Sequence, residues 1–326
     1  MASDINTKMK KKVAELIRNS RRIAITCHVR PDADCIGSGL ALFSMLKQMK
    51  KEVRFFNTDK SPFPLTELPG YNVIEFRQMY PEPFDIVILI EGGTEDRTGM
   101  NHLDKYYTIN IDHHATSSHC CNLNWIVPEA SAAGELVYDL ANELAVQWTK
   151  DIGFNLYAAI SSDTGSFKYS NTTAKALEIA SRLVKKCHFI PLEVSDLLFN
   201  SNHLEKVQMI QKVLSTLELQ VDNRVAMIIF RRAFLTRLSL KDIETEDVIS
   251  IARSILGVDV TLFFKEIDDN FFRVSIRSRG DICSQEVARV FKGGGHPHAA
   301  GFFYRGEIET AKKEILAVVK KQMRVK

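Results

Sequence analysis

The chain has 326 residues, of which 45% are hydrophobic and 25% are charged. This composition is typical of a globular protein that is long enough to form two domains. Its formal net charge of +3 is too small to indicate a protein whose surface binds along a long polyanion. Any nucleic-acid substrate is therefore expected to be short and to be held by a local basic pocket.

Hydropathy and cysteine content indicate in which compartment of the cell the protein is expected. The longest apolar runs, such as residues 84–90, fall far short of the roughly 20 residues that span a bilayer. Residues 1–13 contain no apolar signal core. The six cysteines form no CxxC pair, which favours reduced thiols. We therefore expect a soluble cytoplasmic protein without membrane association.

The first half of the chain alternates between helical and strand-like patterns. The strand-like runs are almost continuously apolar, as expected for a parallel sheet that helices cover on both faces. The sequence therefore predicts a doubly wound α/β domain. In chain order, we expect a helix at residues 8–18, a strand at 22–27, a helix at 36–50, strands at 53–57, 84–91 and 106–112, and helices at 132–144, 152–161 and 173–185.

The pattern changes near Pro191. A long helical stretch at 192–217 is followed by strand-like runs at 225–231, 258–267 and 271–277, and by a last helix at 307–323. The sequence therefore predicts two domains joined by a helix. We assign a first domain to residues 1–190, a connecting helix to 191–217, and a smaller α/β domain to 218–326.

Three side chains able to bind metal follow the first predicted strand. His28, Asp32 and Asp34 lie in a loop at the carboxyl end of that strand, and this is the edge at which open α/β sheets bind ligands. Imidazole and carboxylate groups together suit a divalent ion such as Mn²⁺. The one-residue gap between Asp32 and Asp34 lets the two carboxylates address two neighbouring ions. Taken alone, the segment fits equally well a helix cap at Asp34 and a histidine that ends a strand.

Further acids and histidines follow two other predicted strands. Glu91 ends one apolar run, and Asp112, His113 and His114 follow the next. A carboxylate at the end of an apolar strand is costly to desolvate unless it is paired, hydrogen-bonded or bound to metal. Because three strands deliver such groups to one edge of the sheet, the sequence predicts a metal site there.

Asp163 is a fourth acid in a related place. It follows an apolar helical stretch and opens a glycine-containing turn. By itself it also fits a simple helix-terminal turn. Its position after the other acids favours a role in completing the metal set.

Together these residues resemble the motifs of the DHH phosphoesterase family, and the resemblance covers nearly the whole chain. It implies hydrolysis by two-metal activation of water, with two Mn²⁺ ions as cofactor and Mg²⁺ or Co²⁺ as alternatives. The implied ligands of one ion are His28, Asp32 and Glu91, and those of the other are Asp34, Glu91, His113 and Asp163. Asp112 would orient a ligating imidazole, and His114 would face the substrate and stabilise the transition state or the leaving group.

A second motif lies in the predicted second domain. Arg277-Ser278 and the run from Gly293 to Gly301, with Gly294, Gly295 and His296, resemble the DHH-associated C-terminal domain. In that domain the glycine loop, a histidine and an arginine contact the substrate phosphate. The glycines let backbone amides approach an anion, and His296 and Arg277 can donate hydrogen bonds to phosphate oxygens. A glycine-rich hairpin is the alternative interpretation of the run.

The branch of the family decides the expected substrate. The two-domain length and the glycine loop resemble the oligoribonucleases and 3′-phosphoadenosine-5′-phosphate phosphatases, which implies a short RNA or a small nucleotide. A cyclic-dinucleotide hydrolase or another small-phosphoester hydrolase is an alternative. The family usually has Asp where this chain has Glu91, so a non-catalytic nucleotide- or RNA-binding protein is a further alternative, in which Glu91 disables the metal bridge. The oligomeric state stays open, with a homodimer among the alternatives.

Overall fold

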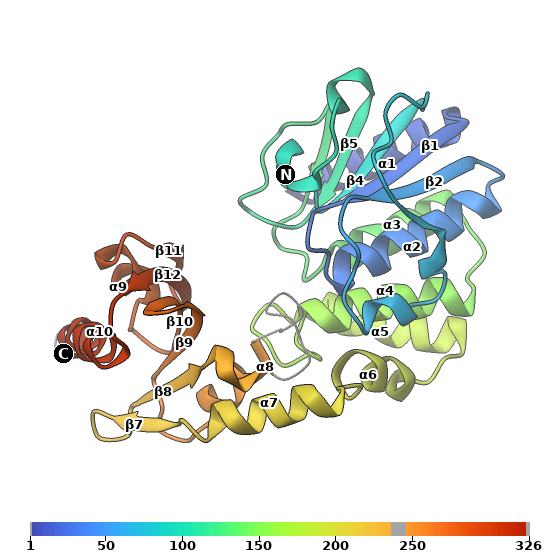
Figure 1. The fold of residues 1–326 in the computed structure, drawn as a ribbon. Coiled ribbons are helices and arrows are strands. Elements are labelled where there is room, and N and C mark those ends of the chain that lie inside the picture. The colour runs from blue at the N-terminus through green and yellow to red at the C-terminus, as the bar shows by residue number, and fades with distance from the viewer. Residues whose placement is uncertain (1, 236–245, 324–326) are drawn as a thin grey trace. The chain divides into compact units, whose positions relative to one another are not determined.

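The computed structural model describes residues 2–235 and 246–323 (Figure 1). The chain divides into two compact units, Met1–Ser201 and Asn202–Lys326, and this division lies within the predicted connecting segment 191–217. The outer limits of the predicted domains, at residues 1 and 326, and the stretch 236–245 lie outside the described residues. Within the described ranges, no helix combines the length and the apolar composition that a membrane span needs.

The first unit is built on a six-stranded sheet in the order β3-β2-β1-β4-β5-β6, and all its strand pairs are parallel. Its central strands are buried along their whole length, which explains their almost continuous apolar sequence. The fold is thus the predicted α/β class. The strands are β1 (Arg22–Cys27), β2 (Glu52–Asn57), β3 (Ile74–Phe76), β4 (Ile86–Ile90), β5 (Thr108–Asp112) and β6 (Leu123–Ile126).

Helices pack on one face of this sheet and form a large core with it. The other face is covered mainly by connecting segments, which include the 3-10 turn Leu103–Lys105. The prediction placed helices on both faces, but on this side the link between β4 and β5 contains only the 3-10 turns Glu95–Thr98 and Leu103–Lys105. The helices of the unit are α1 (Ala2–Asn19), α2 (Ala33–Gln48), α3 (Ala133–Leu144), α4 (Lys150–Asp163), α5 (Ala174–Cys187) and α6 (Pro191–Phe199).

Close packing of α2 against α4 brings two acids together. A Cβ atom at Gly37 in α2 would lie 2.5 Å from the carbonyl oxygen of Asn155 in α4, so only glycine allows this approach. The two helices run in opposite directions at this contact. The first turn of α2, with Asp34, therefore lies near the last turn of α4, with Asp163.

The second unit contains a mixed six-stranded sheet in the order β11-β12-β10-β9-β8-β7, in which only β8 and β9 are parallel. Separate hydrophobic clusters lie against the sheet, one with α9 and α10 and one with α7 and α8. Its elements are α7 (Leu204–Leu214), β7 (Glu218–Gln220), β8 (Val225–Phe230), α8 (Glu246–Arg253), β9 (Val260–Asp268), β10 (Phe271–Ser278), α9 (Ser284–Val290), β11 (Gly294–His296), β12 (Ala299–Arg305) and α10 (Ile308–Met323).

The predicted helix at 192–217 is two helices, α6 and α7, rather than one. Polar side chains end the first of them. The Ser201 hydroxyl donates to the carbonyl oxygen of Asp196 at 2.6 Å, and the Asn200 amide donates to the Asp196 carboxylate at 2.9 Å. The Asp196 carbonyl oxygen, which also accepts the backbone N–H of Asn200 at 3.2 Å, is thus surrounded by polar groups at the end of α6.

Candidate metal centre

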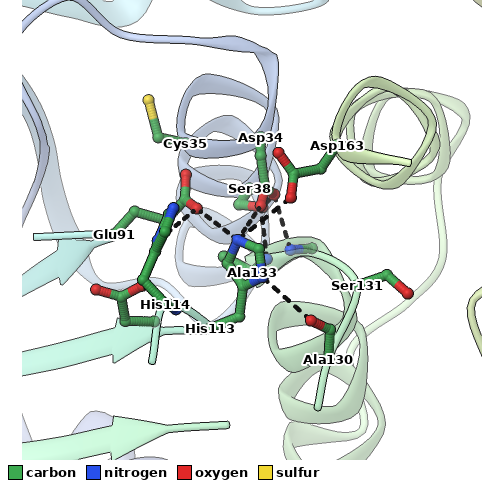
Figure 2. A network of polar contacts seen from close by, with 12 residues as sticks. Asp34, Cys35, Ser38, Glu91, His113, His114, Ala130, Ser131, Ala133 and Asp163 are labelled. Carbon is green, nitrogen blue, oxygen red and sulfur yellow. Dashed lines mark hydrogen bonds and ion pairs between the residues drawn. The ribbon is translucent and has the colours of Figure 1, made fainter. Parts of the chain in front are cut away.

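Side chains from three strand ends and two helices meet at the carboxyl edge of the first sheet. Figure 2 shows those that follow β4 and β5 and those on α2 and α4. The strand order reverses its direction between β1 and β4, and such a switch point is where open α/β sheets bind ligands. The residues that meet include all the predicted metal ligands. His28 follows β1, Asp32 and Asp34 begin α2, Glu91 follows β4, His113 follows β5, and Asp163 ends α4.

The first group of donors consists of His28, Asp32, Cys35 and Glu91, whose ligand atoms all lie within 4.8 Å of one another. The Nδ1 atom of His28 lies 2.9 Å from the carbonyl oxygen of Val29. The Nε2 atom is thereby left to face the carboxylates, 3.6 Å from Asp32 and 3.9 Å from Glu91. This arrangement presents one imidazole nitrogen and two carboxylates to a common point.

Asp32, and not Asp34, is the cap of α2. One carboxylate oxygen of Asp32 accepts a hydrogen bond from the backbone N–H of Cys35 at 3.0 Å, which satisfies a free donor at the helix start. The other oxygen is the one that faces His28. Asp34 lies inside the first turn, so the alternative interpretation of Asp34 as the cap is wrong.

The second group consists of Asp34, His113 and Asp163. The Asp34 carboxylate accepts hydrogen bonds from the backbone N–H groups of Ala133 (2.6 Å) and Gly134 (2.9 Å), at the start of α3. The Nε2 atom of His113 lies 3.7 Å from Asp34 and 3.4 Å from Asp163. Backbone donors thus hold Asp34 in place while it faces the imidazole.

Glu91 belongs to both surroundings. One of its oxygens lies 3.0 Å from His113 Nε2, and the other lies 3.9 Å from His28 Nε2. The side chain is only 1% exposed, yet its Oε2 atom and the Nε2 atom of His113 lack a hydrogen-bond partner. Buried polar atoms without partners are costly. Divalent ions would satisfy them, and the nitrogen and carboxylate donors present fit such ions.

The pKa values of the acids are shifted because several carboxylates are buried close to one another. Burial, together with the nearby Asp34 carboxylate, raises the pKa of Glu91 well above its usual range and raises that of Asp163 to about 8. Burial acts to lower the pKa of His28, but the neighbouring Asp32 carboxylate and Cys35 side chain together outweigh it and the pKa rises to about 11. Bound cations would favour the ionised acids and the neutral imidazole.

Asp112 orients His114 rather than His113. Its carboxylate accepts a hydrogen bond from the backbone N–H of His114 and lies beside the Nδ1 atom of the same residue, both at 2.9 Å. Although burial opposes it, this pairing lowers the pKa of Asp112 to about 2, and it raises the pKa of His114. His113 is oriented instead by the carbonyl oxygen of Ala130, 3.1 Å from its Nδ1 atom. Each histidine therefore has a fixed ring with Nε2 available.

Cys35 is the one member of these groups that sequence analysis missed. Its thiol is fully buried, and burial raises its pKa well above the usual range. The sequence offers a way to predict this residue. Cys35 lies three residues after the cap Asp32, and a side chain at that position of a helix turns back toward the cap.

The glycine motif of the second unit is a hairpin of β11 and β12. A Cβ atom at Gly293 would lie 2.4 Å from the carbonyl oxygen of Gly301, and Gly295 has a φ of +140°, so both positions need glycine. Gly294, Gly295 and His296 are exposed. The run therefore forms a hairpin, which presents these three residues to solvent.

Arg277 and His296 flank the same residue in the sheet. Both pair with Ala299 of β12, from β10 and β11 respectively, and so their side chains share one face of the sheet. Ser278 differs, because it is 1% exposed and its hydroxyl donates to the carbonyl oxygen of Ile282 at 2.5 Å. The Ser278 side chain thus lies within the domain and holds the loop in place.

Comparison with known proteins agrees with this geometry. The model of the DHH family, N-terminal domain, matches residues 22–160, and that of the DHHA1 domain matches residues 210–324. The chain is 29% identical to the bifunctional oligoribonuclease and PAP phosphatase NrnA of Thermus thermophilus, over 92% of this chain and 90% of that one. It is 27% identical to the protein of the same name from Bacillus subtilis, over 90% and 92%.

A solved structure resembles the chain over nearly its whole length. It is the crystal structure of an exopolyphosphatase-related protein from Bacteroides fragilis, with a TM-score of 0.85 and 25% identity over 97% of this chain and 96% of that one. The two matched domains occur in the order that the motifs predict, and the strand-edge residues lie in the first of them or directly after it. Residues 22–160 therefore match the N-terminal domain of the DHH family, and residues 210–324 match the DHHA1 domain that follows it.

Proposed function

We propose that this chain is a metal-dependent phosphoesterase that hydrolyses short oligoribonucleotides and 3′-phosphoadenosine-5′-phosphate. The observation that carries the proposal is the pair of adjoining donor groups at the sheet edge, linked by Glu91, with two buried ligand atoms that lack hydrogen-bond partners. The relatives are named as oligoribonuclease and PAP phosphatase, and these names support the choice of substrates. We place the activity in the cytoplasm, where the six free thiols of the chain stay reduced.

Two divalent ions fit the donors, with Mn²⁺ as our first choice and Mg²⁺ or Co²⁺ as alternatives. When bound, such ions activate water and neutralise charge on phosphate oxygens. Glu91 would bridge the two ions, because its two oxygens face different imidazoles. The proposed ligands are His28, Asp32 and Glu91 for one ion, and Asp34, Glu91, His113 and Asp163 for the other.

His114 is the proposed proton donor to the leaving oxygen. Its side chain is 38% exposed, so its Nε2 atom is accessible to a substrate. Asp112 holds the ring through Nδ1 and favours the protonated imidazole. A histidine held in this way can give its Nε2 proton to the oxygen that departs and recover it from solvent.

The glycine hairpin is the proposed binding site for a substrate phosphate. The exposed glycines Gly294 and Gly295 let an anion approach the backbone of the hairpin, and His296 and Arg277 can add charge-assisted hydrogen bonds from the same face of the sheet. Ser278 contributes indirectly, because its buried hydroxyl accepts a hydrogen bond from Ser284 and so fixes the adjoining loop.

The test is product formation from 5′-phosphorylated diadenylate, and phosphate release from 3′-phosphoadenosine-5′-phosphate, each with Mn²⁺ and with a chelator. We expect hydrolysis of both with Mn²⁺ and none with the chelator. Asp34→Asn should reduce the rate to the chelator level, because it removes a charged ligand of the second group. Asp151→Asn makes the same change at an exposed position of α4 and should keep full activity.

Two outcomes would contradict the proposal. Hydrolysis that continues in the chelator, or in Asp34→Asn, would place the chemistry elsewhere in the chain. A folded protein that binds 3′-phosphoadenosine-5′-phosphate but hydrolyses neither substrate with any of the three ions would be a non-catalytic nucleotide-binding protein.

A further inference from the structure

The first donor group contains a thiol that the proposed ligand set does not use. Cys35 is the third residue of α2, and its side chain is fully buried. Its Sγ atom lies 3.5 Å from the backbone carbonyl oxygen of Asp32. It also lies within 4.8 Å of the ligand atoms of His28, Asp32 and Glu91. Figure 2 shows Cys35 on the first turn of α2, on the same side as Glu91.

The neighbours of Cys35 indicate that its thiol does more than fill space in the core. The Oε2 atom of Glu91 is buried without a hydrogen-bond partner, and it is the oxygen that faces His28. Asp32 uses one oxygen as the helix cap and turns the other toward the same imidazole. A nitrogen, two carboxylates and a sulfur thus surround one point, and four donors of these types suit a divalent transition metal.

We propose that the Cys35 thiolate is a fourth protein ligand of the ion held by His28, Asp32 and Glu91. The inference rests on the proposed function only in placing an ion at this group. On binding, the Sγ–H proton passes to solvent and the sulfur lone pair forms the bond to the ion.

The sulfur ligand makes the two ion sites different. The second group, Asp34, His113 and Asp163, offers only nitrogen and oxygen donors. Thiolate ligands favour softer ions such as Zn²⁺ and Co²⁺ and disfavour Mg²⁺, which prefers oxygen. The first site should therefore select a transition metal, whereas the second should accept a wider range of ions.

A neighbouring thiol provides a matched control. Cys27 is the last residue of β1, is also fully buried, and accepts a hydrogen bond from the Asn57 side-chain amide at 3.0 Å. Cys27 is not a member of either donor group. Its replacement changes a buried thiol close to the site without removing a proposed ligand.

The experiment is a titration of the reduced, metal-free protein with Co²⁺, followed by absorption spectroscopy. A cobalt–thiolate bond gives a charge-transfer band in the near ultraviolet that nitrogen and oxygen ligands do not give. We expect the band in the wild type and in Cys27→Ser, and its loss in Cys35→Ser and Cys35→Ala. Cys35→Ser should also weaken Co²⁺ binding by about tenfold or more while leaving Mg²⁺ binding unchanged.

Two results would overturn the inference. One is wild-type protein that binds Co²⁺ stoichiometrically without the band, and the other is a band that persists in Cys35→Ala. Circular dichroism checks that the variants fold. If they do not fold, cobalt X-ray absorption of the wild type decides alone, because a sulfur neighbour at about 2.3 Å is required and a shell of nitrogen and oxygen only would contradict it.

The spectrum does not depend on turnover, so this inference and the proposed function can fail separately. Mn²⁺-dependent hydrolysis without a cobalt–thiolate band would remove the Cys35 ligand and leave the phosphoesterase. A Cys35-dependent band in a protein that hydrolyses neither test substrate would leave the metal ligand and remove the phosphoesterase.

Discussion

Glu91 reaches both donor groups because of its unusual backbone. It has a φ of 54° directly after β4, in a region that residues other than glycine seldom occupy. Its backbone N–H is nevertheless bonded to the carbonyl oxygen of Ile111 at 2.9 Å, so β5 holds the strained residue in place. The Glu91 side chain, which is one methylene longer than Asp, thus has a fixed origin from which its two oxygens reach His28 and His113.

Glu91→Gln is expected to weaken Mn²⁺ binding by about tenfold to a hundredfold, as measured by calorimetry. The amide keeps the size of the side chain but removes the charge and one good ligand oxygen. The stability of the metal-free protein should change little, because Gln keeps the volume of the side chain and removes a carboxyl whose pKa burial raises well above its usual range. Glu15→Gln, at an exposed position of α1, is the control. Unchanged Mn²⁺ affinity in Glu91→Gln would exclude the bridge.

The two histidines after β5 should respond differently to replacement. His114→Ala should lower kcat by about a hundredfold or more, because a proton donor is lost, while the bound metal content stays at the wild-type level. His113→Ala should lose metal together with activity. Elemental analysis alongside steady-state kinetics separates the two roles. Loss of metal in His114→Ala would make this residue a ligand instead.

Sequence reasoning works well for ligands that end strands. The positions of Glu91 and His113 at one edge follow from buried parallel strands, whose carboxyl ends must meet. It fails for Cys35, because the direction of that side chain depends on the capping geometry of Asp32. It also fails to identify the histidine that Asp112 orients. Both His113 and His114 follow Asp112 within two residues, and the sequence does not distinguish between them.

At the scale of elements, the α2–α4 contact positions the second donor group. Gly37→Ala is expected to lower the free energy of unfolding by about 1–3 kcal/mol, because the added methyl group would force the helices apart. Urea denaturation measures this change. Gly294→Ala is the control, since a Cβ atom there meets nothing within 4 Å. Unchanged stability in Gly37→Ala would contradict this, because it would mean that α2 and α4 leave space for a methyl group at this contact.

Helices and strands are predictable from the sequence where their pattern of apolar residues is long. The helix at 152–161 and the strand at 53–57 appear with boundaries shifted by two residues or less. The short strands β3 and β6 have too few residues to give a clear period. Apolar periodicity did not reveal the break between α6 and α7, which lies where Asn200 and Ser201 hydrogen-bond through their side chains to Asp196.

At the scale of the whole molecule, the acid cluster couples stability to pH. The pKa of Asp163 is raised from 3.8 to about 8 by burial and by Asp34, and that of His28 is raised as well. The folded protein therefore binds more protons than the unfolded chain as the pH rises from about 4 toward 8, and its stability must fall over that range.

Thermal unfolding in the presence of a chelator tests this coupling. The Tm should decrease from pH 5 to pH 8, and Asp163→Asn should make the decrease smaller because it removes one of the raised groups. Added Mn²⁺ should reverse the trend, since metal binding favours the ionised carboxylates. A Tm that rises with pH in the chelated protein would contradict the pKa directions of the cluster.

The most direct test of the two-metal centre is anomalous X-ray scattering from crystals grown with Mn²⁺. We expect two peaks in each chain, one bounded by His28, Asp32 and Glu91 and the other by Asp34, His113 and Asp163. Crystals of active protein that show no manganese at these residues, or a peak at only one group, would contradict it.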